Sequence, residues 1–289
     1  MKKLAVALGG GGARGLAHIG FLRILEKEKL PISRISGCSM GAMIGGAYCL
    51  FQDVKQVEEH TYRFINNPLF KEFNFDDFAS IDRHGEDIRS KATLVLGRIK
   101  VGISFFRTLA HSSIYDLEVV EKIYAEYPEA QIEDLPVPFS VTANDILTGK
   151  EVRIDSGSLR KAIQASSAVP GYFPPVPYNK FMLVDGGVTN LVPTNHFQKN
   201  ENELIVGVDV SQPMKKPTEI KSGIMILQRA EAIREDHLAQ LKMSSADKIV
   251  HCNLHNVSWA AFDKADEIIK MGETAGKQFV RWVDKNKIL

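Results

Sequence analysis

Glycines on both sides of Ser39 mark the first place in this chain where residue types and spacing could carry out chemistry. The stretch Gly37-Cys38-Ser39-Met40-Gly41 follows a short apolar run and precedes a run of small residues typical of a helix. A G-x-S-x-G pattern in this setting is typical of a nucleophile elbow, a sharp turn that exposes the serine hydroxyl. The pattern predicts that Ser39 is a nucleophile and that the next backbone N–H, of Met40, points toward a developing oxyanion. The alternative is a helix cap that is merely rich in glycine and serine.

Four consecutive glycines at residues 9–12 lie between another apolar run and another helical pattern, and the sequence continues as Ala13-Arg14-Gly15. Because glycine leaves backbone N–H groups unshielded, such a loop can bind an anion, and the following helix adds a favourable dipole. The stretch also satisfies the GxGxxG pattern of dinucleotide-binding proteins. That interpretation is disfavoured because residues 32–34, where an acidic ribose ligand would lie, contain no acid. A phosphate-binding P-loop is excluded because no Lys-Ser or Lys-Thr pair follows the glycines.

A carboxylate followed by two glycines, Asp185-Gly186-Gly187, ends a further apolar run. A rigid strand can present such a terminal carboxylate into a cleft. On its own, an Asp-Gly pair is more often a plain turn. This third motif is therefore informative only in combination with the other two.

In this order, the three motifs resemble those of the patatin-like phospholipase family, in the bacterial branch related to neuropathy target esterase. The resemblance covers about residues 4–65 and 135–210. It implies an α/β fold with a mostly parallel central sheet flanked by helices, in a three-layer sandwich. It also implies a serine acyl-ester hydrolase that acts on phospholipid, lysophospholipid or another fatty-acyl ester, with no metal and no other cofactor.

The resemblance implies that Ser39 and Asp185 form a catalytic dyad. Ser39 would attack the ester carbonyl, Asp185 would take its proton, and Asp185 would then activate water to hydrolyse the acyl-enzyme. Backbone N–H groups would form the oxyanion hole, and those expected to do so belong to Gly10, Gly11, Gly12 and Met40. The residues expected to support the motifs are Arg14, Gly15, Gly37, Gly41, Gly186 and Gly187. Arg14 could orient the loop or bind an anionic head group, and a structural role is an equal alternative.

A histidine offers an alternative base, because Ser39, Asp185 and His196 follow the chain order of an α/β-hydrolase triad. We favour the dyad, since His196 falls on an expected helix after Pro193. His18 has the setting of a packed residue of the first helix. The remaining histidines form no metal-ligand spacing with carboxylates or cysteines, so no metal site is predicted.

A sheet must position these motifs, and short apolar runs that alternate with helical patterns predict one that is largely parallel. Expected strands cover residues 4–8, 32–37, 139–143, 151–154, 181–184, 203–210 and 248–253. Expected helices cover residues 16–29, 40–50 and 221–242, and a last helix ends near residue 282. We predict one domain over residues 1–289, with a helical insertion at about 66–134 and C-terminal helices over about 215–289.

Composition and charge narrow the possible function classes. The 289 residues are 44% hydrophobic and 25% charged, which is typical of a soluble globular protein. The 36 Lys and Arg against 35 Asp and Glu leave a net charge of +1, so bulk charge gives no reason to expect nucleic acid. The three cysteines have unrelated spacings and indicate a reducing compartment, and no apolar run is long enough to span a membrane. We therefore expect a cytoplasmic protein.

Residues 94–109 interleave cations with aromatic and aliphatic residues and contain no acid. This segment could give peripheral contact with anionic lipid at the inner membrane surface, or it could be an ordinary helix whose arginines reach outward. The expected partner is a lipid or acyl-ester substrate, and the sequence predicts no oligomeric state. The alternatives to a phospholipase are a non-catalytic lipid-binding protein on the same fold and an esterase that acts on non-phospholipid acyl esters.

Overall fold

The computed structural model describes residues 2–73, 113–214, 216, 219–220 and 222–288 of the chain. Within these residues, eight strands form one mixed sheet in the order β5-β6-β3-β2-β1-β7-β8, and β4 pairs with β3 outside this path. The strands are β1 (Lys3–Leu8), β2 (Ile32–Gly37), β3 (Phe139–Asp145), β4 (Lys150–Ile154), β5 (Val176–Tyr178), β6 (Phe181–Asp185), β7 (Glu203–Asp209) and β8 (Lys248–His251).

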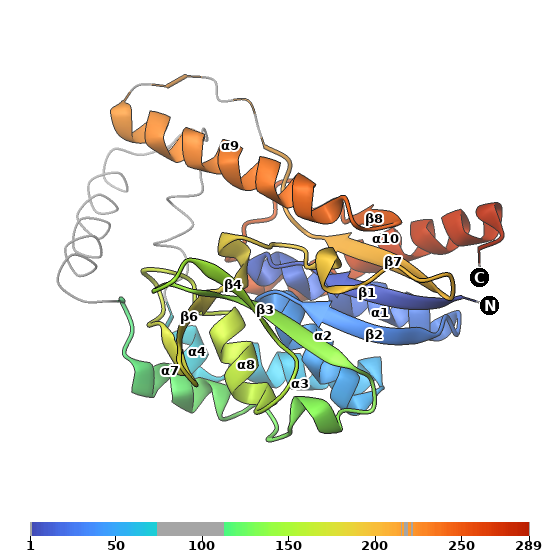
Figure 1. Ribbon diagram of the computed structural model, residues 1–289, viewed down its shortest axis with the longest axis horizontal. Helices are drawn as coiled ribbons and strands as arrows, with labels where there is room; N and C mark the ends of the chain where they lie inside the picture. Colours follow the sequence, from blue (N-terminus) through green and yellow to red (C-terminus); the bar gives the residue numbers. More distant parts are fainter. Residues whose placement is uncertain (1, 74–112, 215, 217–218, 221, 289) are drawn as a thin grey trace.

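Helices follow most of the strands (Figure 1). The α-helices are α1 (Ala17–Lys27), α2 (Met40–Phe51), α3 (Val54–Asn66), α4 (Pro68–Lys71), α7 (Leu117–Tyr124), α8 (Leu159–Ser166), α9 (Gly223–Met243) and α10 (Ala265–Asn286). Short 3-10 helices are η1 (Gly12–Leu16), η2 (Ile132–Asp134), η3 (Gly186–Val188), η4 (Thr194–His196) and η5 (Phe262–Lys264). Side-chain caps fix several helix starts. For example, the Asp53 carboxylate accepts the Lys55 N–H at 2.8 Å at the start of α3.

The centre of the sheet is parallel. Strand β1 pairs in parallel with both β2 and β7, β2 pairs in parallel with β3, and β7 with β8. Because parallel strands end at the same edge of a sheet, the glycine loop after β1 and the serine turn after β2 lie next to each other. Strand β6 runs antiparallel to β3, with Asp185 opposite Ala143. The predicted fold class is therefore confirmed, with an antiparallel part formed by β3 to β6.

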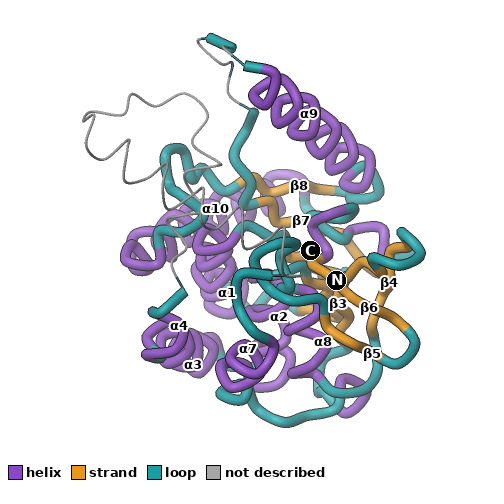
Figure 2. Tube along the Cα trace, turned by 90° about the vertical axis from the view of Figure 1, so that its left-hand side faces the viewer, coloured by secondary structure: helices purple, strands orange, loops and turns teal. Residues whose placement is uncertain are grey.

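Side chains along β1 alternate between the two faces of the sheet, which carry cores of different size. Leu4, Val6 and Leu8 point into the larger core, which they share with α1, α2, α8 and α10. The smaller Ala5 and Ala7 point to the other face, where the cluster around Val192, Phe197 and Ile205 covers them. Figure 2 shows α9 on its own, away from the group of α1, α2 and α3.

Helices α1 and α10 pack together where two glycines let their backbones approach. A Cβ on Gly20 would lie 1.9 Å from the Ile269 carbonyl oxygen, and one on Gly272 would lie 1.9 Å from the Ala17 carbonyl oxygen. This contact joins the C-terminal helix to the helix that directly follows the glycine loop. The first and last helices of the chain therefore share one core.

Sequence and structure differ in a few elements. The short strand β5 was not predicted, and α10 continues past the predicted end near Trp282 to Asn286. Of the predicted insertion, the structure describes α4, α7 and η2, while the 94–109 segment lies outside the described residues. Among the residues that the structure describes, no helix combines the length and the apolar composition needed to cross a membrane.

Candidate active site

Ser39 lies in a strained turn between β2 and α2. Its backbone angles are φ 51° and ψ −121°, a conformation that residues other than glycine rarely adopt. A Cβ on Gly37 would lie 2.5 Å from the Ala42 Cα, and one on Gly41 would lie 2.1 Å from the Leu8 carbonyl oxygen. Both flanking glycines are therefore required by backbone contacts, as the elbow pattern predicts.

A hydrogen bond to a residue that the sequence analysis did not single out stabilises the elbow. The Ser39 N–H donates a hydrogen bond to the Ser166 hydroxyl at 3.0 Å, from the end of α8. The family resemblance covers residues 135–210, but nothing in that range indicated which side chains would contact the elbow.

The glycine loop packs against both the elbow and the C-terminal part of the chain. Gly12 has φ +57°, and a Cβ there would lie 2.4 Å from the Trp259 carbonyl oxygen. A Cβ on Gly15 would lie 2.5 Å from the Met40 Cγ. The Arg14 Nε–H donates to the Gly11 carbonyl oxygen at 3.3 Å, so Arg14 helps to shape the loop.

The backbone N–H of Gly10 is not available to an oxyanion, which corrects one of our assignments. It donates to the Leu191 carbonyl oxygen at 2.9 Å. Gly10 instead allows close packing, because a Cβ there would lie 3.2 Å from Cys38 Sγ and 3.4 Å from Ser39 Cβ. Within the described residues, no acceptor takes the N–H groups of Gly11, Gly12 or Met40. These three remain the candidate oxyanion donors.

Asp185 stands at the end of β6, where its carboxyl group is almost fully buried. Its Oδ1 accepts the Gly187 N–H at 2.7 Å and the Cys38 thiol at 3.8 Å. Burial raises the pKa of Asp185 to about 6, and interactions with Gly187, Ser39 and Cys38 only partly offset that rise. The fold thus brings the Ser39 side chain within interaction range of the Asp185 carboxyl.

The turn that carries Asp185 is fixed by its neighbours on β3. A Cβ on Gly186 would lie 2.4 Å from the Thr142 carbonyl oxygen, so a side chain there would displace the turn. Asn144 Nδ2 donates to the carbonyl oxygens of Asp185 at 2.7 Å and Gly186 at 3.1 Å. A single asparagine inside a strand carries no sequence signal of this role, and we did not predict it.

His196 makes its contacts away from Ser39. Its Nδ1 is 2.8 Å from the Ser36 hydroxyl, and its Nε2 is 3.2 Å from Glu151 Oε1. Both ring nitrogens are thus engaged in a buried network beneath the elbow. His18 is fully buried in α1, with Nε2 2.8 Å from the Gly9 carbonyl oxygen, and burial lowers its pKa to about 4.

An apolar cavity opens beside Ser39. It has a volume of about 70 Å³. Most of the residues that line it are aromatic or aliphatic, and they come from helices of the larger core and from the segment after β8. They are Gly12, Ser39, Met40, Met43, Phe64, Phe70, Phe73, Ile123, Tyr124, Ser167, Val169, Phe173, Trp259 and Phe262.

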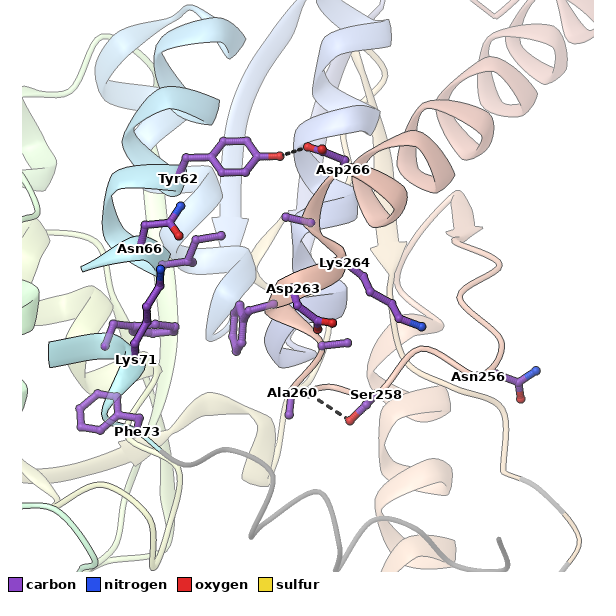
Figure 3. Close-up of a pocket in the computed structure, with 15 residues that line it drawn as sticks. Tyr62, Asn66, Lys71, Phe73, Asn256, Ser258, Ala260, Asp263, Lys264 and Asp266 are labelled. Atoms are coloured by element: carbon purple, nitrogen blue, oxygen red, sulfur yellow. Dashed lines mark hydrogen bonds between the residues drawn. The ribbon is translucent and has the colours of Figure 1, made fainter. Parts of the chain in front are cut away.

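A larger and more polar cleft, of about 890 Å³, adjoins this cavity (Figure 3). Phe70, Phe73 and Phe262 line both spaces, so these rings form the boundary between them. The cleft also carries charged side chains. These are Lys71, Asp263, Lys264 and Asp266. Tyr62 donates its hydroxyl hydrogen to Asp266 across the upper part of the cleft, and Lys71 and Lys264 extend from opposite walls.

Comparison with known sequences gives a consistent assignment. The sequence model of patatin-like phospholipases matches residues 6–197, a range that contains all three motifs. An uncharacterised NTE family protein of Mycobacterium tuberculosis is 32% identical over 209 residues, which are 72% of this chain and 49% of that protein. The lysophospholipase NTE1 of Cryptococcus neoformans is 29% identical over 209 residues, 72% of this chain and 11% of that protein. The chain spans about half the length of these relatives or less.

Comparison with solved structures supports the fold. The crystal structure of VipD from Legionella pneumophila superposes with a TM-score of 0.51 at 16% sequence identity. The superposition covers 96% of this chain and 66% of that chain. At this level of identity, the likeness concerns the fold and not the substrate.

Proposed function

Because this chain belongs to the patatin-like phospholipase family, we propose that it is a serine hydrolase that cleaves fatty-acyl esters of phospholipids or lysophospholipids. The observation that supports the proposal is the strained turn at Ser39, whose side chain interacts with the buried Asp185 carboxyl. Strained backbone conformations cluster at active sites and ligand-binding sites. N–H groups that have no acceptor among the described residues adjoin the same serine, as does an apolar cavity.

In the first step, Ser39 Oγ attacks the ester carbonyl carbon while its proton passes to the Asp185 carboxylate. A carboxylate with a pKa of about 6 accepts this proton more readily than an ordinary aspartate with a pKa of about 4. The negative charge moves to the former carbonyl oxygen. The N–H groups of Gly11, Gly12 and Met40 are the donors available to this oxyanion. Each such donor stabilises the transition state by about 3 kcal/mol.

In the second step, the tetrahedral intermediate collapses. The bond to the leaving alcohol breaks, and that alcohol takes the proton from Asp185, which leaves an acyl-enzyme on Ser39. A water molecule then gives a proton to Asp185 and attacks the acyl carbon, and the fatty acid departs as Ser39 regains its proton. His196 takes no part in this scheme, because Ser36 and Glu151 hold its ring.

The two adjoining spaces suggest how a lipid would lie. The acyl chain would enter the aromatic cavity beside Ser39, where burial of its methylene groups favours binding by about 0.8 kcal/mol each. The polar end would extend past the shared phenylalanines into the charged cleft. Lys71 and Lys264 are the cations there that could meet a phosphate group.

Covalent labelling tests the proposal directly. We expect a fluorophosphonate probe to label the purified protein, Ser39→Ala to remove the label, and Ser244→Ala, in an exposed turn, to keep it. The same protein should release fatty acid from a phospholipid or a lysophospholipid. A protein that binds lipid vesicles but is never labelled would instead be a lipid-binding member of the family. Hydrolysis of short acyl esters alone would indicate an esterase.

A further inference from the structure

Helix α9 carries a seven-residue repeat on its outer side. Leu227, Glu231, Arg234, Leu238 and Leu241 are spaced by four, three, four and three residues, the spacing that places side chains along one seam of a coiled coil. The two outer leucines are largely exposed, Leu227 at 68% and Leu241 at 69%.

Four of the five seam residues are exposed, and Leu238 is half-buried. The opposite side of α9 carries the half-buried Ala232, Ala239 and Met243, and Met243 packs against the small cluster on the sheet. The C-terminal end of α9 is held by Lys242, whose Nζ lies 2.7 Å from Glu151 Oε2. Figures 1 and 2 show α9 lying along the outside of the molecule, beyond β7 and β8. Its position is therefore fixed from one side, and Leu227, Glu231, Arg234 and Leu241 stay exposed on the other.

The four seam residues from Leu227 to Leu238 are symmetric about their midpoint, with charges of opposite sign. Reading outward from the midpoint between Ala232 and Ile233, Glu231 corresponds to Arg234, and Leu227 corresponds to Leu238. A two-fold axis at this midpoint would place each residue opposite its counterpart in an antiparallel second helix. Leucine would then meet leucine, and glutamate would meet arginine.

We propose that a second copy of this chain packs its own α9 against this seam, antiparallel and about that two-fold axis. Leu227 would contact Leu238 of the partner subunit, and Glu231 would bond to Arg234 of the partner subunit. Within one chain, Glu231 and Arg234 already form an ion pair. At the axis, each carboxylate would therefore meet two guanidinium groups, and the four charges would cancel.

The central charges select this arrangement over its competitors. A parallel pair of helices would set Glu231 against Glu231 and Arg234 against Arg234, which is repulsive. A shift by one heptad in the antiparallel pair would set the charges against leucines. Burial of charged groups weakens a dimer relative to an all-leucine seam, but it fixes orientation and register. A lipid surface would offer no counterpart for the alternating charges at the centre of the seam.

Sedimentation velocity of the purified full chain over a wide concentration range tests the pairing. We expect wild-type protein to form a dimer whose fraction rises with concentration. Leu227→Glu should weaken self-association at least tenfold. The matched control is Ile226→Glu, a neighbouring residue that is 58% exposed but lies off the seam, and this variant should dimerise as wild type does. Circular dichroism and hydrolysis of a soluble ester should be unchanged in both.

Charge exchange tests the orientation. Glu231→Arg alone and Arg234→Glu alone should each weaken the dimer at least tenfold, because each places like charges at the axis. The double variant, and an equimolar mixture of the two single variants, should restore it. Wild-type protein that stays monomeric at every concentration overturns the proposal, as does a double variant no better than the single ones. Loss of vesicle binding by Leu227→Glu in a monomeric protein would also overturn it, in favour of a lipid-facing helix. None of these outcomes depends on whether Ser39 is active.

Discussion

Burial of the Asp185 carboxyl group has opposite consequences for the proposed activity and for the stability of the folded protein. Burial raises its pKa to about 6, because the charged form loses water that the Gly187 N–H replaces only in part. In the proposed mechanism, the raised pKa makes the carboxylate a better base for Ser39. The same burial makes the ionised carboxylate a source of instability in the folded protein.

The pH dependence of activity should report this carboxyl group. Only the ionised form can accept the Ser39 proton, so kcat/KM for a soluble short-chain ester should rise tenfold per pH unit below about 6 and level off above about 7. Steady-state kinetics between pH 4.5 and pH 8.5 measures this midpoint. A midpoint near 4, the value of an exposed aspartate, would contradict the role of burial.

Removal of the charge should stabilise the protein while it abolishes turnover. The folded pKa of Asp185 lies above its unfolded value, so its ionisation lowers stability as pH rises from about 4 to about 6, and the loss remains at pH 7. The shift of about two pH units corresponds to about 3 kcal/mol. We therefore expect Asp185→Asn to be inactive and to melt at a higher temperature than wild type at pH 7.5.

A second buried aspartate, Asp209, has a pKa that is shifted in the opposite direction and provides the control. Hydrogen bonds from His251 and Ser211 hold the pKa of Asp209 below its usual value despite its burial. Asp209→Asn should therefore lower the melting temperature at pH 7.5. If both variants shift the melting temperature in the same direction, the pKa of Asp185 is not raised in the way described.

His196 distinguishes a dyad from a triad. His196→Ala should keep most of kcat, because the ring contacts Ser36 and Glu151 and not Ser39. The loss of these buried hydrogen bonds should lower the free energy of unfolding by about 1–3 kcal/mol. Kinetics well below the melting temperature separates the two effects. A fall in kcat comparable to that of Asp185→Asn would favour a triad in which His196 is the base.

At the scale of helices and strands, the parts of the site that follow directly from a strand end were predictable. The elbow is a local motif, since Gly37 and Gly41 are required by contacts within a few residues or with the adjacent strand, whereas Gly12 of the glycine loop is required by the distant Trp259. The support from Ser166 and Asn144 was not predictable, because it depends on the pairing of β3 with β6 and on where α8 ends. The loss of Gly10 as an oxyanion donor has the same origin, since its acceptor at Leu191 is distant in sequence.

The α1–α10 contact gives a prediction at this scale. An alanine in the middle of a helix normally gains about 1 kcal/mol over glycine. In Gly272→Ala, however, the new Cβ would lie 1.9 Å from the Ala17 carbonyl oxygen, and separating the two backbones costs more than that gain. We expect a net loss of about 2 kcal/mol in chemical denaturation. Gly223→Ala is the control, because a Cβ there would meet no described atom within 4 Å outside its own turn of helix, and its stability should be unchanged or slightly higher.

At the scale of the whole molecule, distant segments meet around one serine. The elbow comes from the first 50 residues, Asp185 from the middle of the chain, and Trp259 and Phe262 from the last 35 residues. The last of these segments belongs to the part of the sequence that matched no familiar pattern. The C-terminal segment lines both the cavity and the cleft. Residues that select the substrate can therefore lie in this segment, outside the three motifs.

The charged cleft makes the choice of substrate testable in the intact protein. If a phosphate group extends past Phe70 and Phe262 into the cleft, Lys71 lies on the wall that meets it. We expect Lys71→Ala to lower kcat/KM about tenfold for a lysophospholipid, which corresponds to the loss of one charge-assisted hydrogen bond. Hydrolysis of a monoacylglycerol with the same acyl chain should be unchanged, because it has no phosphate. Lys55→Ala, an exposed lysine on α3 outside the cleft, serves as the control for net charge. An equal loss on both substrates would mean that Lys71 supports the shape of the site and does not bind phosphate.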